Sequence, residues 1–203
     1  MFSQIYLGPI FGFNASKVRY DNEYYNESLK AFQKFRVGIN SGFLTYFYFG
    51  KVMDVRAETI FTQKGFSFND TYTSGYKVFG FAEENVAGQL DLNYDSKVMV
   101  SPYLGYFGAY WLYGKRKYFD YKNDIYITDK IYLKNDTIFE YNRIDLGLIA
   151  GVDFKYKLSK KQILTFGFKY EFSLLSSAKN KVDGWKNRNI SIFLAYNFKI
   201  SKR

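Results

Sequence analysis

Acidic side chains recur at short spacing in this sequence, and paired carboxyl groups can do acid–base chemistry. Asp54 with Glu58 and Asp91 with Asp95 are two such pairs. A glycosidase uses two carboxyl groups, one as an acid and the other as a base or nucleophile. The chain has no histidine and no cysteine, so the commonest general base, a thiol nucleophile and cysteine-rich metal sites are all missing. We therefore expect no enzymatic activity and no catalytic, cofactor-binding or metal site.

The same acidic residues alternate with apolar ones, which predicts a different role for them. In the stretch 143–156, RIDLGLIAGVDFKY, the even positions are apolar or aromatic from Ile144 to Tyr156. The odd positions hold Arg143, Asp145, Asp153, Lys155 and glycines as well as one isoleucine. A period of two indicates a β-strand with two unlike faces. Its length of about a dozen residues fits a tilted transmembrane strand, which needs roughly 9–11.

Seven further stretches predict strands of the same kind, which gives eight in all. The predicted strands cover residues 5–16, 35–47, 53–64, 89–98, 102–115, 143–156, 162–173 and 188–198. Long connections over 17–34, 65–88, 115–142 and 174–187 alternate with short turns, and IYITDKIYL in the third of them predicts a hairpin extension. This is the plan of an all-β, transmembrane, antiparallel up-and-down β-barrel with four long external loops. We expect one domain over residues 1–203.

Composition favours the bacterial outer membrane. Tyr and Phe number 21 and 22, the chain has only 2 prolines, and no run of about 18 apolar residues predicts a membrane helix. The N-terminus lacks the charged and apolar regions of a signal peptide, so we interpret the chain as the mature form of an exported protein. The net charge of +10 is spread along the chain, which argues against nucleic acid and favours outer-membrane glycolipid as a partner.

The barrel interior is the predicted position of the charged side chains. An eight-stranded barrel is just wide enough for side chains to fill, so seven acids and six bases should pair as a polar plug. A conducting pore is the alternative for this interior. A soluble lipid-binding barrel is the rival fold, with the same period and the apolar face turned inward. The predicted interior charges are Arg36, Asp54, Arg56, Glu58, Asp91, Asp95, Lys97, Arg143, Asp145, Asp153, Lys155, Lys169 and Glu171.

A set of short motifs in a fixed order resembles the PorT-like outer-membrane β-barrel family of Bacteroidota. The motifs are LGPIFGFNAS, VRAETIFTQKGFSF, QLDLNYDSKV, PYLGYFGAYWLYGKRK, IDLGLIAGVDF, FKYEFSLLS and ISIFLAYNF. Lys169 in FKYEF stands where the family often has arginine. The resemblance implies a small integral outer-membrane barrel, with some members in secretion machinery.

We therefore expect an accessory or scaffold subunit of a larger outer-membrane complex for protein secretion, assembly or transport, in contact with other outer-membrane or periplasmic proteins. Tyrosines in the predicted loops suit protein contact, or alternatively an interfacial belt. A surface adhesin that binds through its long loops and a narrow channel are the other hypotheses. The candidate contact residues are Tyr20, Tyr24, Tyr25, Tyr72, Tyr76, Tyr118 and Tyr121.

Overall fold

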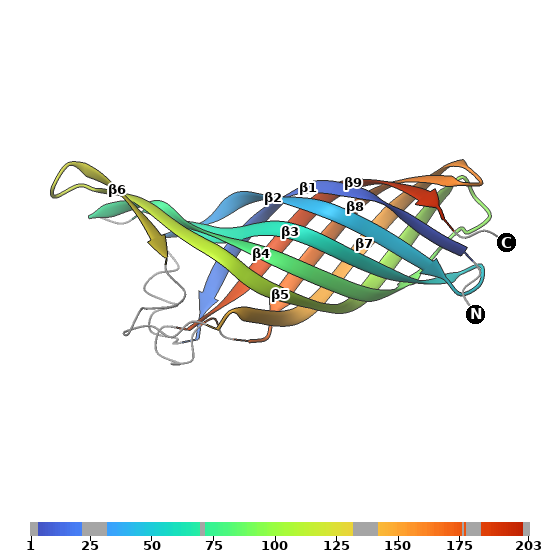
Figure 1. Cartoon of the computed structure of the whole chain (residues 1–203), viewed down its shortest axis with the longest axis horizontal. Helices are drawn as coiled ribbons and strands as arrows, with labels where there is room; N and C mark the ends of the chain where they lie inside the picture. The colour runs from blue at the N-terminus through green and yellow to red at the C-terminus, as the bar shows by residue number, and fades with distance from the viewer. Residues whose placement is uncertain are drawn as a thin grey trace.

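The computed structural model describes residues 4–21, 32–69, 72–131, 142–175, 177 and 184–200, which form nine β-strands. The strands are β1 (Gln4–Tyr20), β2 (Gln33–Tyr48), β3 (Met53–Asn69), β4 (Thr73–Leu90), β5 (Val98–Asp120), β6 (Ile125–Ile131), β7 (Ile144–Ser159), β8 (Gln162–Ser173) and β9 (Trp185–Lys199). Eight of them pair in a closed antiparallel ring, in the order β1-β2-β3-β4-β5-β7-β8-β9 and back to β1. β6 pairs only with the end of β5. The predicted up-and-down barrel is confirmed, and the ninth strand is the predicted hairpin extension (Figure 1).

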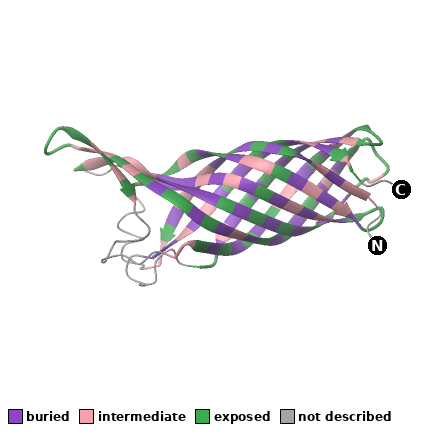
Figure 2. Ribbon diagram, in the orientation of Figure 1, coloured by how far each residue is buried: buried purple, intermediate pink, exposed green. Residues whose placement is uncertain are grey.

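The barrel turns its apolar side chains outward. In β7, Ile144, Leu146 and Leu148 expose 54%, 45% and 37% of their surface, whereas Asp145 and Asp153 are buried. The same alternation of buried and exposed residues covers the ring (Figure 2). A soluble lipid-binding barrel would show the reverse, with its leucines around the cavity. The burial pattern therefore excludes that rival fold.

Both ends of the described chain lie at one end of the barrel, beside the short connections (Figure 1). Residues 49–52 join β2 to β3, residues 91–97 join β4 to β5, and residues 160–161 join β7 to β8. Asn93 has a φ of 56° in the second of these turns, a conformation that asparagine tolerates better than most residues. The β5–β6 hairpin projects from the opposite end. By the plan of outer-membrane barrels, the end with the short turns is the periplasmic one.

The fourth strand is where the sequence-based prediction is wrong. Residues 65–88, predicted as a loop, form the end of β3 and most of β4, with only residues 70–72 between the two strands. The predicted strand 89–98 is instead the last part of β4 and the turn after it. Three of the outward positions of β4, Ala82, Glu84 and Gly88, interrupt the apolar pattern, which leaves only Val86 and Leu90 on that face, and a register shift at Gly80/Phe81 changes the phase of the alternation. The period-two pattern is therefore hidden in this strand.

Aromatic rings inside the barrel lie over glycines of the neighbouring strand. Tyr103 and Phe107 on β5 stand opposite Gly151 and Gly147 on β7. A Cβ added at either glycine would lie 2.4 Å from the facing ring. The glycines of DLGLIAG thus leave the space that these rings occupy. Together with the buried ions, the rings fill the lumen.

Candidate functional site

The charged interior is built around Arg56, which β3 places at the centre of the lumen. Its Nε lies 3.1 Å from Asp153 Oδ2 on β7, and its NH2 group bonds to Glu58. The guanidinium lies over the rings of Tyr103 and Phe193, at 4.3 and 5.0 Å from their centroids. All these groups are buried. Arg56 therefore ties opposite walls of the barrel together and blocks the space between them.

A second centre, nearer the periplasmic end, is formed by Lys155. Its Nζ lies 2.7 Å from Asp54 Oδ2 and 2.8 Å from Asp91 Oδ1, and 4.1 Å from the ring centroid of Tyr46. The hydroxyl of Ser101 donates a hydrogen bond to the same oxygen of Asp91, at 2.6 Å. A buried ammonium normally needs such opposite charges around it. Lys155 joins β7 to β3 and to the first residue after β4.

A third centre contains two lysines and three glutamates. Lys169 Nζ lies 2.8 Å from Glu58 Oε2, 2.9 Å from Glu171 Oε1 and 3.5 Å from Glu83 Oε1. Lys64 Nζ lies 2.6 Å from Glu83 Oε2 and 2.8 Å from Glu171 Oε2. Because Glu58 bonds to both Arg56 and Lys169, this centre is continuous with the first.

Nine of the thirteen residues predicted for the interior are buried, and the other four are not. The buried nine are Asp54, Arg56, Glu58, Asp91, Asp145, Asp153, Lys155, Lys169 and Glu171. Asp95 and Lys97 are exposed in the β4–β5 turn, because β4 ends at Leu90. Arg36 is half-buried near the start of β2, over the ring of Tyr76. Arg143 precedes β7 and donates a hydrogen bond to the hydroxyl of Tyr110 at 3.0 Å.

Two interior charges, Lys64 and Glu83, lie outside the set predicted from the sequence. Lys64 lies on the inward face of β3 beyond Glu58, so the alternation of that strand could have predicted that it is buried. Glu83 falls in the stretch wrongly predicted as a loop. With these two, the described interior holds seven acids and four bases, not a near balance: Asp54, Glu58, Glu83, Asp91, Asp145, Asp153 and Glu171 against Arg56, Lys64, Lys155 and Lys169.

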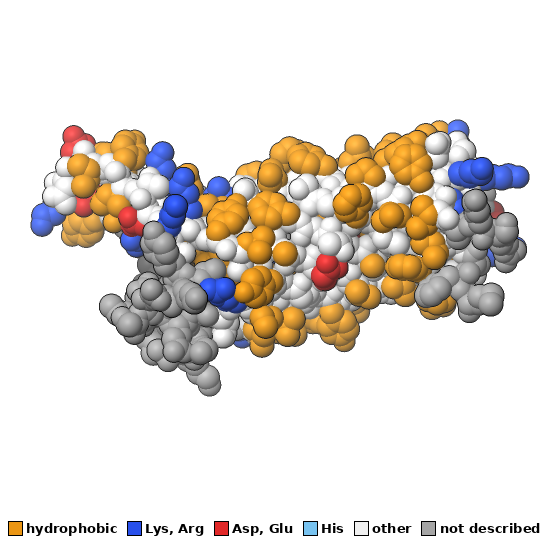
Figure 3. Space-filling view, in the orientation of Figure 1, with side chains coloured by type: hydrophobic (Ala, Val, Ile, Leu, Met, Phe, Trp, Pro, Cys, Tyr) orange, Lys and Arg blue, Asp and Glu red, His pale blue; other side chains and the backbone are white. Residues whose placement is uncertain are grey.

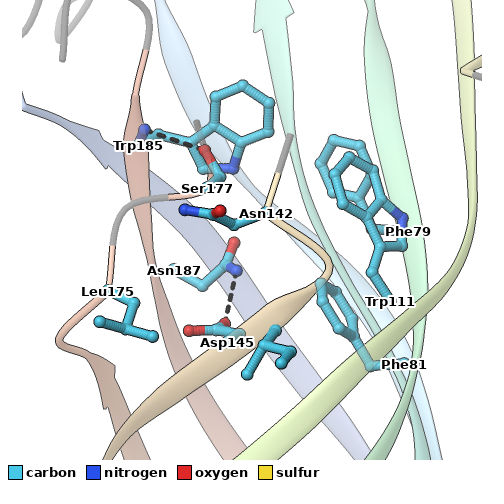
Figure 4. A pocket seen from close by; sticks show the side chains of 10 residues that line it. Phe79, Phe81, Trp111, Asn142, Asp145, Leu175, Ser177, Trp185 and Asn187 are labelled. Carbon is cyan, nitrogen blue, oxygen red and sulfur yellow. Dashed lines mark hydrogen bonds between the residues drawn. The ribbon is translucent and has the colours of Figure 1, made fainter. Parts of the chain in front are cut away.

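The external end of the lumen is closed by aromatic and amide side chains (Figure 4). Phe79 packs against Trp111 and Trp185, with ring centroids 4.8 and 5.8 Å apart. Asn187 Nδ2 donates a hydrogen bond of 2.8 Å to Asp145 Oδ2. The cavity between these groups measures about 10 Å³, which is room for about one water molecule. It has no space for a ligand.

Four of the candidate contact tyrosines, Tyr72, Tyr76, Tyr118 and Tyr121, come together although the sequence places them in two separate predicted loops. Antiparallel pairing of β4 with β5 sets Tyr76 opposite Lys117 and Gly75 opposite Tyr118, and the amide N–H of Tyr121 bonds to the carbonyl of Tyr72 at 3.0 Å. These strand ends and β6 form a ribbon that extends beyond the ring (Figure 1). Tyr20, the last residue of β1, is half-buried. Tyr24 and Tyr25 lie outside the described residues.

A hollow of about 310 Å³ opens at the base of this ribbon. Its lining combines aromatic rings, including Phe66 and Tyr118, with the cationic side chains of Lys77 and Arg116. Across the ribbon, Arg116 pairs with Asp129 at 2.7 Å, with both side chains about two-fifths exposed. Exposed pairs of this kind contribute little stability. The ribbon therefore presents aromatic and charged groups to its surroundings.

The described residues contain no group of three or more His, Cys, Asp or Glu side chains placed to hold a metal ion. No helix among them is long and apolar enough to cross a membrane. The buried carboxylates face lysine, arginine, amide or hydroxyl groups. Such an arrangement stabilises and fills the lumen.

Most of the chain is similar to one known protein family. The family model described as outer membrane protein β-barrel domain matches residues 2–179, most of the chain. The chain belongs to this family. The outer-membrane protein β-barrel domain family places the protein in the bacterial outer membrane, in agreement with its outward apolar side chains (Figure 3). A search of curated proteins finds no match.

Solved structures of outer-membrane proteins are similar to this barrel at low sequence identity. OprG from Pseudomonas aeruginosa is 8% identical with a TM-score of 0.52, and the match covers 98% of this chain and 96% of OprG. The attachment invasion locus protein Ail of Yersinia pestis is 13% identical with a TM-score of 0.46, over 96% of this chain and 98% of Ail. Neisserial surface protein A is 14% identical with a TM-score of 0.43, and the match covers 94% of this chain and 95% of that protein. At this identity the similarity to OprG shows the fold alone.

Proposed function

We propose that this outer-membrane barrel is a non-enzymatic accessory or scaffold subunit of a larger outer-membrane complex. The observation that carries the proposal is the external ribbon, where β4, β5 and β6 gather tyrosines from distant parts of the chain. Tyr72, Tyr121 and Tyr126 expose 73%, 50% and 75% of their surface there. Exposed tyrosines at high density are typical of protein–protein interfaces. The filled lumen also favours a docking role over transport through the barrel.

The PorT-like resemblance adds a specific form of this proposal. It suggests a complex for protein secretion, assembly or transport, with other outer-membrane or periplasmic proteins as partners. Glycolipid is the second proposed partner, because the ribbon carries exposed lysines that suit anionic phosphate groups. These lysines are Lys115, Lys117, Lys122 and Lys130.

A surface adhesin or binding protein is the second candidate function. The projecting ribbon supports it too, since a surface ligand would meet these exposed tyrosines first. The two candidates differ in where the partner resides. A subunit of a complex binds a protein of the same membrane, whereas an adhesin binds a ligand added from outside.

The experiment that tests the proposal is extraction of the protein from its native membrane in mild detergent, followed by native mass spectrometry. We expect the chain to emerge with other outer-membrane or periplasmic proteins in a fixed ratio. The double variant Tyr72→Ser/Tyr121→Ser should lose them, whereas Lys122→Ser in the same hairpin should keep them. Recovery of the wild-type chain alone would contradict the proposal. Retention of an added surface ligand by that lone chain would instead favour the adhesin.

A further inference from the structure

One acidic side chain of the ring lies on the wrong face for an interior ion. Among the described residues of the ring strands, the acids are buried in the lumen except for Glu84, which is exposed on the outside of β4, and Asp120 at the external end of β5. Figure 3 shows an acidic side chain midway along the barrel, with hydrophobic side chains on either side. A carboxylate on a lipid-facing surface is costly and by default indicates a function.

The position of Glu84 along its strand places it deep in the membrane. It lies six positions before Leu90, the last residue of β4. At about 3.3 Å per residue and a strand tilt of about 40°, Glu84 lies about 15 Å from the periplasmic end of the strand. The apolar band of an outer-membrane barrel is about 25 Å tall. Glu84 is therefore near its middle.

Several outward side chains around Glu84 are small, although Val86 on β4 and Tyr106 on β5 also lie there, 55% and 70% exposed. Thr59 and Gly108 are the neighbours of Glu84 on β3 and β5, and the Thr59 hydroxyl donates a hydrogen bond to Glu84 Oε2 at 2.8 Å. Two residues away, Ala82 is exposed, and a Cβ added at Gly88 would meet nothing within 4 Å. Small residues of this kind let another transmembrane segment approach closely.

The outward face of β9, four strands away around the ring, shows the contrast. Ile190, Ile192 and Leu194 stand at successive outward positions there and are 43–53% exposed. Such a surface suits acyl chains. The surface around Glu84 is formed by Thr59, Ala82, Glu84, Val86, Gly88 and Gly108, and it combines a carboxylate and a hydroxyl with mostly small side chains.

The charge of Glu84 determines the chemistry of its partner. A buried or lipid-exposed carboxylate is best compensated by a cation. Every described Lys or Arg of this chain that is not buried lies in a connection or within five residues of a strand end. A second copy at the same depth would thus bring no cation from these residues to Glu84, and a symmetric contact would bring two carboxylates together.

We propose that the surface around Glu84 is an intramembrane docking site for a different transmembrane protein, which presents a lysine or arginine at the same depth. The inference rests on the proposed function, because it names where a partner subunit meets this barrel. It differs from the external ribbon, which makes contacts outside the membrane. The two surfaces share strands β4 and β5, so one partner can reach both.

Photo-crosslinking in the native membrane tests this surface. Tyr106, two residues from Gly108 and 70% exposed, is replaced by p-benzoylphenylalanine. The matched control is the same replacement at Phe11, 52% exposed on β1, four strands away in either direction and at a similar distance from the periplasmic end. We expect a discrete protein adduct from position 106 and none from position 11. Mass spectrometry should place the linkage in a membrane-spanning segment close to a lysine or arginine.

Crosslinking at a specific docking site should depend on the charge of Glu84, whereas crosslinking by chance proximity should not. Glu84→Leu should reduce the yield of the adduct at least ten-fold, whereas Glu84→Asp should retain it. Heat-modifiable migration in gels should show that both variants are folded barrels. Glu84→Lys combined with a Glu at the partner's cationic position should restore the adduct. The proposal would be overturned if the adducts contained only lipid or a second copy of this chain. It would also be overturned if positions 106 and 11 gave equal adducts, or if Glu84→Leu left the adduct unchanged.

Failure of this docking site can be distinguished from failure of the proposed subunit function. If native extraction recovers a complex but the adduct does not depend on Glu84, the subunit role stands and this docking site is wrong. If extraction recovers the chain alone and no protein adduct forms, both are wrong.

Discussion

Lys64 Nζ on β3 lies 2.6 Å from Glu83 Oε2 on β4, and this ion pair links the two neighbouring strands inside the lumen. Both residues are buried, and Lys64 also bonds to Glu171 on β8, across the lumen. The interior holds more acids than bases, and each base contacts more than one carboxylate. The two partners of this contact should therefore differ in their importance for stability.

Lys64→Met should be much more destabilising than Glu83→Gln. Loss of the ammonium leaves Glu83 and Glu171 with Lys169 as their remaining cation, and breaking a buried pair in this way costs about 3–5 kcal/mol. Glu83→Gln leaves Lys64 paired with Glu171 and should cost about 1 kcal/mol. The free energy of unfolding in urea, measured in lipid vesicles, gives both values. Equal losses would contradict the unequal charge distribution.

The filled lumen predicts that the wild-type protein carries no ion current in a planar bilayer. Arg56 and the rings of Tyr103 and Phe193 occupy the centre, so truncation of all three to alanine should open a path. Asp153 and Glu58 remain beside that path, which should make its current steps cation-selective. The control is Phe11→Ala, which shortens an outward-facing side chain and should give no current. A conducting wild type would support the channel hypothesis instead.

The strands that could be predicted from the sequence are those whose outward residues are large and apolar. In β7, Ile144, Leu146 and Leu148 mark one face, and the charged residues of the other face follow at once. In β4, Ala82, Glu84 and Gly88 take three of the outward positions while Phe79 and Phe81 are buried, so hydrophobicity does not distinguish the two faces.

The candidate site was predictable to the same extent as its strands. Asp153 and Lys155 follow from the pattern of β7, whereas Glu83 depends on the position of β4 and could not be assigned from the sequence. Partner choice also depends on the folded structure. Lys155 meets Asp54 and Asp91 from distant parts of the chain, and only the closure of the ring brings them together.

Inward glycines of β7 should not tolerate a methyl group. In Gly151→Ala, the new Cβ would lie 2.4 Å from the Tyr103 ring and 2.2 Å from the carbonyl oxygen of Phe168. Overpacking of this kind typically costs about 1–3 kcal/mol. Gly88→Ala is the control, because its Cβ would enter open space on the outer face. Its urea midpoint should match or slightly exceed the wild-type value, and equal destabilisation by both changes would refute the packing account.

The tip of the external hairpin should loosen at acidic pH. The Asn123 side chain, together with the amide N–H groups of Lys122 and Asn123, donates hydrogen bonds to the Asp120 carboxylate and holds the pKa of Asp120 below its ordinary value of 3.8. A lowered pKa means that the ionised form stabilises the folded tip. Its contribution is complete above the unfolded pKa and is lost as the pH falls through the folded one. Hydrogen-exchange protection of the Lys122 amide should therefore fall as the pH drops below the ordinary pKa of 3.8. Asp120→Ala should give low protection at every pH, whereas Asp124→Asn, which suits the positive φ of 54° there, should keep the wild-type profile. Protection that stays constant in the wild type would show that these hydrogen bonds do not hold the tip.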